Sequence, residues 1–82
     1  MKKLYTLLVR DLKNGMCEVT KGAAAVAKPQ TPDHFFRVLE QLGDGPSLIA
    51  LRRKEYETRR CLWLREIELD EAGLRLLGFT AV

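Results

Sequence analysis

The sequence of 82 residues lacks most of the features by which an enzyme or a metal protein is recognised. It holds one histidine and two cysteines, and Cys17, His34 and Cys61 do not follow the spacing of zinc ligands. No glycine cluster resembles a phosphate-binding loop. Asp33 and His34 are neighbours at a helix start and therefore do not face each other as an acid–base pair. The sequence predicts no catalytic residue, no metal site and no cofactor, so we expect a protein that is not an enzyme.

Long apolar runs are also missing. The run Leu4–Val9 has six residues before Arg10 and Asp11 end it, which is short for a signal peptide. It is far below the roughly 20 residues that span a membrane. We therefore expect a cytoplasmic protein with no membrane partner, whose cysteines are reduced thiols.

The composition is that of one small globular domain. Apolar residues make up 46% of the chain and charged residues 30%, a balance that argues against disorder. A chain this short buries only about 60% of its unfolded surface, so one core is all it can build. We expect a single domain over residues 1–82.

The positive charge is concentrated in one segment. Residues 51–65 carry six basic and two acidic side chains, while the whole chain has a net charge of +3. The other 67 residues therefore sum to −1. A local basic patch favours an acidic partner, although such a run is also typical of a solvated surface.

Residues 4–20 predict a β-hairpin. Asn14-Gly15 is a strong turn former between an apolar, β-favouring stretch and the return strand MCEVT. The alternative is a helix over 4–13, because leucines also recur there at helical spacing. Residues 21–31, which are small and contain Pro29, predict a connector.

The next element is a helix over residues 32–42. Thr31 is a good N-cap and Pro32 suits the first position of a helix. Four apolar residues then fall on one face, and Phe36 widens it. Gly43 is the residue expected just past the end. The four residues of the stripe are Phe35, Val38, Leu39 and Leu42.

Residues 44–69 allow two interpretations. One long helix would have only Tyr56 as a sizeable apolar residue between Arg52 and Arg60, and so no core face. Two apolar runs, LIAL and CLWL, around a polar centre favour a second hairpin, although KEYET lacks turn formers. We favour the hairpin, whose tip would gather cations from both strands.

The parity of the second strand predicts which residues face the helix. Cys61, Trp63, Ile67 and Leu69 share one side and would pack on it. Leu62 and Leu64 share the other side, which needs a second cover. Residues 71–82 could supply that cover, or a homodimer or a partner protein could complete it. Asp70 caps a short helix, EAGLRLL, that closes at Gly78 with Phe79 packing back.

The predicted element order is ββαββα, an α+β fold with one antiparallel sheet and helices packed on it. Residues 32–77 suggest a different fold, because they resemble the wing half of winged-helix regulators of the MarR type. The stretch RRCLWLREIELDEAGLRLL carries most of this resemblance. The resemblance implies a mostly α fold with a basic β-wing that contacts DNA. Three features favour the α+β fold instead. Residues 4–20 predict a hairpin, the wing lacks turn formers, and the helix that would enter the groove carries the acidic Asp33 and Glu40.

We expect a small non-catalytic binding protein. The leading hypothesis is a regulatory or inhibitory adaptor, expected as a homodimer, that docks on a larger protein with an acidic surface. The alternative is a nucleic-acid-binding protein that contacts phosphates through the basic hairpin tip 52–60. The candidate partner-binding residues are Arg52, Arg53, Lys54, Tyr56, Arg59, Arg60, Leu62 and Leu64.

Overall fold

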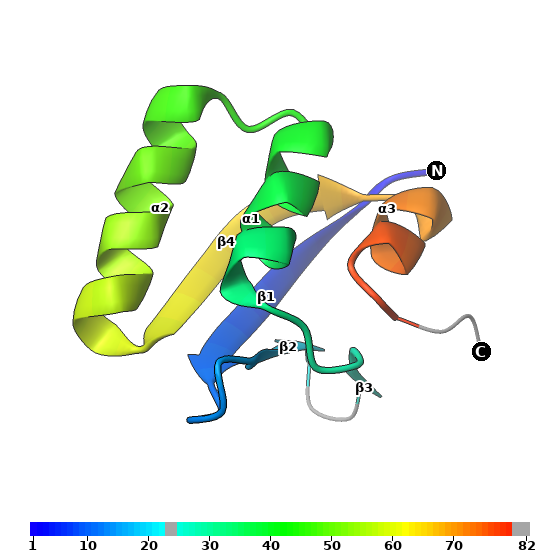
Figure 1. Ribbon diagram of the computed structural model, residues 1–82. Coiled ribbons are helices and arrows are strands. Elements are labelled where there is room, and N and C mark those ends of the chain that lie inside the picture. The colour runs from blue at the N-terminus through cyan, green and yellow to red at the C-terminus, as the bar shows by residue number, and fades with distance from the viewer. Residues whose placement is uncertain (23–24, 80–82) are drawn as a thin grey trace.

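The computed structural model describes residues 1–22 and 25–79 and shows an α+β fold, as predicted. Its sheet is antiparallel with the strand order β3-β2-β1-β4, and the helices pack on one side of it (Figure 1). Within the described residues the elements are β1 (Lys3–Asp11), β2 (Cys17–Lys21), β3 (Ala25–Val26), α1 (Pro32–Gln41), α2 (Pro46–Arg59), β4 (Cys61–Leu69) and α3 (Glu71–Leu76).

The N-terminal hairpin is confirmed, and the alternative helix over 4–13 is wrong. Strands β1 and β2 pair from Leu7↔Lys21 to Asp11↔Cys17. In the turn, the Asn14 side chain accepts a hydrogen bond from a backbone N–H two residues on, at 3.1 Å. The predicted connector contains the short strand β3, which pairs with β2.

Helix α1 is confirmed with nearly its predicted bounds. The Thr31 hydroxyl accepts a hydrogen bond from the backbone N–H of His34 at 3.1 Å, and Pro32 opens the helix. Gly43 follows the helix with φ of +112°, a backbone conformation that glycine adopts without strain. The apolar side of α1 lies in the core, including Phe36, which the main stripe does not contain.

The second predicted hairpin is wrong in its first half, because residues 46–59 form helix α2. Ile49 and Tyr56 lie seven residues apart on one side of this helix, and both are buried. Pro46 stands at the first helical position, and the helix ends at Arg60, which has φ of +55°. The basic tip is therefore a helix surface, and the wing of the winged-helix alternative is absent from the described residues.

Strand β4 is confirmed, but the predicted assignment of its faces is only half right. Between the pairs Tyr5↔Ile67 and Leu7↔Leu64, β1 advances by two residues and β4 by three. This β-bulge shifts the alternation, so that residues 62, 64, 67 and 69 all face the helices. Trp63 consequently points to the opposite side of the sheet.

The C-terminal helix is confirmed, but it covers the end of the sheet on the same side as α1 and α2 and not, as expected, on the opposite side. The Asp70 carboxylate accepts a hydrogen bond from the backbone N–H of Gly73 at 2.8 Å, and this bond holds the pKa of Asp70 below its usual value. The backbone N–H of Phe79 donates to the carbonyl of Leu74 at 3.0 Å, and the Phe79 ring is buried. All three helices thus lie on one side of the sheet (Figure 1).

Candidate protein interface

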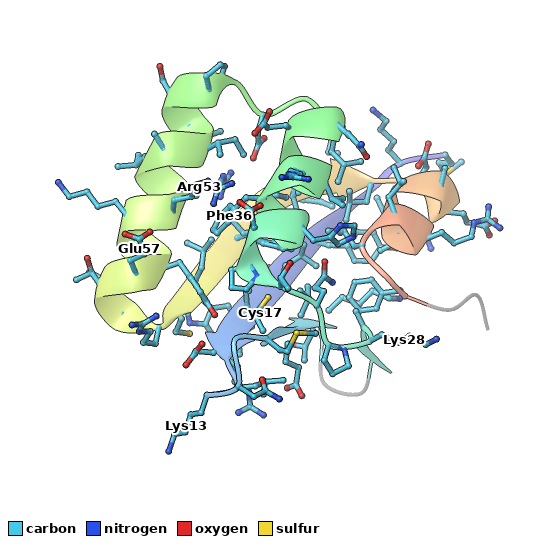
Figure 2. The ribbon with its side chains drawn as sticks, viewed as in Figure 1. Lys13, Cys17, Lys28, Phe36, Arg53 and Glu57 are labelled. Carbon is cyan, nitrogen blue, oxygen red and sulfur yellow. The ribbon has the colours of Figure 1, made fainter. Side chains whose placement is uncertain are left out.

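Two of the predicted binding arginines are engaged within the chain. The Arg53 guanidinium lies 3.0 Å from an Asp33 carboxylate oxygen and 4.8 Å from the centre of the Phe36 ring, so it fills the space between α2 and α1 (Figure 2). Arg52 Nε lies 3.0 Å from Asp44 Oδ2, with both side chains about four-fifths buried. These contacts pair two of the six basic side chains of residues 51–65 within the chain.

Of the cations in this segment whose side chains the structure describes, three are exposed near the C-terminal end of α2. Lys54 and Arg60 form no ion pair in the described residues. Arg59 lies 4.0 Å from Glu55, a weak contact because the Arg59 side chain is 73% exposed. We name Lys54, Arg59 and Arg60 the helix-end cations.

Tyr56 is a core residue, which overturns the expectation that it contacts a partner. Only 3% of its surface is exposed, and its ring packs edge-on against Phe36 with centroids 6.1 Å apart. Its hydroxyl donates a long hydrogen bond of 3.5 Å to Asp11 Oδ1. Burial, together with the nearby Cys17 and Asp11, raises the pKa of Tyr56 to about 12.

The expected positions of Leu62 and Leu64, on the side that faces away from the helix, are also wrong. The two residues are 1% and 0% exposed and pack beneath the helices with Leu7 and Val9 of β1. The bulge in β4 explains the error, because a strict alternation cannot place both halves of this strand in the core. Neither leucine is available to a partner in this fold.

The uncovered side of the sheet carries a different apolar surface. Leu4 and Trp63 are 62% and 58% exposed, and the half-buried Leu8 stands directly beside Trp63 in the pairing of β1 with β4. With Thr6 and Thr20 they line a shallow depression. We name these five residues the open face. Sequence reasoning missed it because the bulge position is not visible in the residue pattern.

Polar side chains surround the open face. Arg10 binds Glu18 across β1 and β2 at 3.0 Å, next to Cys61. At the other end, Glu68 is exposed opposite Leu4. An apolar centre with a charged rim is the usual composition of a protein–protein contact surface.

A second hollow lies on the helix side, where α3 meets the ends of β1 and β2. The Lys21 ammonium stands 5.6 Å from the ring centres of both Tyr5 and Phe79. Lys3, Arg75, Asp70 and Glu71 also line this hollow, so its charges are mixed. The two aromatic rings hold the Lys21 ammonium at this hollow.

Among the described residues, histidine and cysteine occur only as His34, Cys17 and Cys61. They contain no group of three or more His, Cys, Asp or Glu side chains that could bind a metal ion. Burial, with Asp11 nearby, raises the pKa of the Cys17 thiol to about 11, which makes it a poor nucleophile. Among the same residues no helix combines the length and apolar character that crossing a membrane requires.

Comparison of the chain with protein-family models, with curated proteins and with solved structures finds no match. The functional inference therefore rests on the geometry of the open face and the helix-end cations.

Proposed function

We propose that this chain is a non-catalytic binding protein, a regulatory or inhibitory adaptor that docks on another protein through the open face. The observation that carries the proposal is that the helices cover one side of the sheet and leave the other side open. Its helix side is buried, while its other side exposes Trp63 and Leu4 around Leu8. In so small a domain, leaving a tryptophan 58% exposed on a sheet is costly in solubility, which supports a partner over that face.

The residue types also suit binding. Tryptophan contributes disproportionately to the affinity of protein interfaces, because its large rigid ring loses little entropy on contact. Arg10 and Cys61 mark the end of the sheet at which α2 terminates in Arg59 and Arg60. A partner with an apolar strip flanked by carboxylates would match this surface. The free thiols of Cys17 and Cys61 support a reducing, cytoplasmic setting.

The test places a photo-crosslinking residue at position 63 and, as a control, at the exposed position 57 on α2. A protein captured only from position 63 is then purified and titrated against the wild type, Trp63→Ser and Leu51→Ser. Leu51 on α2 is 62% exposed, the same fraction as Leu4, and so reports the effect of removing an exposed leucine elsewhere.

We expect Trp63→Ser to weaken binding by about tenfold or more, mainly through faster dissociation, and Leu51→Ser to change it by less than about twofold. Circular dichroism verifies that both variants fold. A partner whose affinity depends on Leu51 and ignores Trp63 would contradict the open face as the docking surface.

Nucleic-acid binding remains the alternative, now through the helix-end cations. The pairing of Arg52 and Arg53 within the chain removes part of the charge on which this alternative depended. Fluorescence anisotropy with short DNA and RNA at about 50 and 200 mM salt decides it. Binding that falls more than about tenfold over this range, and is lost in a variant with Lys54, Arg59 and Arg60 changed to Ala, would favour phosphate contact. No binding at low salt would exclude it.

A further inference from the structure

We infer that the hollow beside α3 is a binding site for a small organic acid, that is, a carboxylate carried on an apolar body. We name it the α3 hollow. It lies on the helix side of the sheet, where Lys3 pairs with Leu69 at the end of β4, just before α3 begins (Figure 1). Its volume of about 570 Å³ lies within the roughly 300–1,000 Å³ of sites that hold small molecules. The inference does not depend on the open face, which is on the other side of the sheet.

The sheet and the C-terminal segment supply apolar walls to the α3 hollow. Lys3, Tyr5 and Leu7 alternate along β1 and so point to the same, helix-covered side. Leu7 is fully buried, Tyr5 is half-buried and Lys3 is exposed, so the cover of the sheet thins toward the start of β1. The half-buried Leu74 and the buried Phe79 line the hollow from the other side. An apolar ligand body would remove the exposed parts of Tyr5 and Leu74 from water.

The charged side chains of the α3 hollow favour a negative ligand. Both of its acids are engaged, because Asp70 accepts a backbone N–H of its own helix at 2.8 Å and Glu71 lies 3.9 Å from Arg75. Lys3 and Lys21 also line the hollow, and neither forms an ion pair within the described part of the chain. The two ammonium groups therefore leave an excess of positive charge that a carboxylate would neutralise.

Lys21 is the residue best placed to bind the negative group. Its ammonium lies 5.6 Å from the ring centres of both Tyr5 and Phe79, so it is held at the hollow before a ligand arrives. Its side chain donates no hydrogen bond to the residues that the structure describes. A carboxylate beside it would accept charge-assisted hydrogen bonds from the ammonium. Because Lys21 is already positioned, little side-chain entropy is lost on binding.

The experiment is an NMR titration of the isotope-labelled chain with naphthoate and with octanoate, an aromatic and an aliphatic carboxylate. We expect the backbone amide signals that shift to cluster at residues 3–5, 20–22 and 69–79, with a Kd at or below about 1 mM for the tighter acid. Tighter binding of naphthoate identifies an aromatic acid as the ligand class, and tighter binding of octanoate an aliphatic one. Shifts that leave residues 69–79 unchanged, or a Kd above about 10 mM for both acids, would overturn the site.

Two further probes separate the contributions of the charge and the apolar body. Naphthalenemethanol has the ring system of naphthoate without its charge, and inorganic phosphate has a negative charge without an apolar body. We expect each to bind at least about fivefold more weakly than the tighter acid. Equal affinity for naphthalenemethanol would show that the ammonium groups play no part, and equal affinity for phosphate would show the same for the apolar walls. Either result would contradict an organic acid as the ligand.

A lysine variant tests the anchor directly. Lys21→Met keeps most of the aliphatic length and removes the ammonium, so we expect it to bind the carboxylate at least about fivefold more weakly. Lys54→Met, at an exposed lysine of α2, is the matched control and should change the affinity by less than about twofold. The amide spectra of both variants verify that they fold. Carboxylate binding as tight in Lys21→Met as in the wild type would overturn the inference.

Discussion

Helices α1 and α2 lie side by side over the same sheet, yet they are held there by different interactions. Four residues of α1 are buried along one apolar side, and a threonine side chain caps its first turn. Helix α2 is longer, but only Ile49 and Tyr56 are buried, and the glycine at its N-cap offers no side-chain hydrogen bond. Its remaining attachment to the fold is by Arg52 and Arg53.

The difference shows how a polar helix can be part of a small fold. The apolar stripe of α1 lies within its own ten residues and its cap is the residue just before them. The polar contacts of α2 depend mainly on residues distant in sequence, namely Asp11, Asp33 and Phe36, with Asp44 just before the helix. Helix α1 is therefore expected to be as stable as the whole domain. Helix α2 should open locally at a lower free energy.

The largest expected effect comes from Tyr56→Ala. Removing a buried aromatic side chain costs about 3–5 kcal/mol, and here it removes one of the two buried anchors of α2. We expect native-state hydrogen exchange to show lost protection in residues 46–59, with protection in β1 and α1 retained better. Urea denaturation gives the overall loss.

Two controls sharpen this prediction. Tyr56→Phe keeps the ring and removes only the 3.5 Å hydrogen bond, so the loss should stay below about 1 kcal/mol. Leu39→Ala in α1 should cost about 2–5 kcal/mol and lower protection throughout the domain. Equal loss of protection in α1 and α2 after Tyr56→Ala would show that the two helices open together.

The same difference explains what could be predicted from the sequence. The hairpin at Asn14-Gly15 and helix α1 were predicted because turn chemistry, the Thr31 cap and an apolar stripe are local features. Helix α2 was missed because the contacts of Arg52 and Arg53 appear only after folding. The open face was missed because one extra residue in β4 reverses the alternation that places Trp63.

Alkaline pH should test the junction between α2 and the hairpin, where Tyr56 and Cys17 are both buried. The folded pKa of Cys17 is raised from 9.0 to about 11, and that of Tyr56 from 10.0 to about 12. A group whose pKa is raised by folding contributes its full stabilisation at pH values below its unfolded pKa. This stabilisation is lost as the pH rises through the folded pKa. Between pH 7 and 10.5 we expect a loss on the order of 2 kcal/mol, mostly from Cys17.

Urea denaturation at pH 7, 9 and 10.5 measures this loss. In Cys17→Ala the stability should be lower at neutral pH but should fall less steeply between pH 9 and 10.5, because the titrating thiol is gone. An unchanged slope in that variant would exclude Cys17 as the source. Thiol titration offers a second readout, in which Cys61 reacts in the folded protein and Cys17 only after unfolding.

The smallest effects are expected at the helix starts, where α1 has a cap and α2 does not. Thr31→Ala removes the acceptor for the His34 N–H and should cost about 1 kcal/mol.

Gly45→Ser supplies a hydroxyl at the N-cap of α2. The backbone φ there is an ordinary −73°, and no atom lies within 4 Å of the added Cβ. The variant should therefore be more stable by a few tenths of a kcal/mol. Because α2 is the more weakly held helix, the gain from Gly45→Ser should appear mainly as slower hydrogen exchange within residues 46–59. The loss from Thr31→Ala should instead lower the urea midpoint of the whole domain, and a change confined to α1 would show that α1 also opens independently.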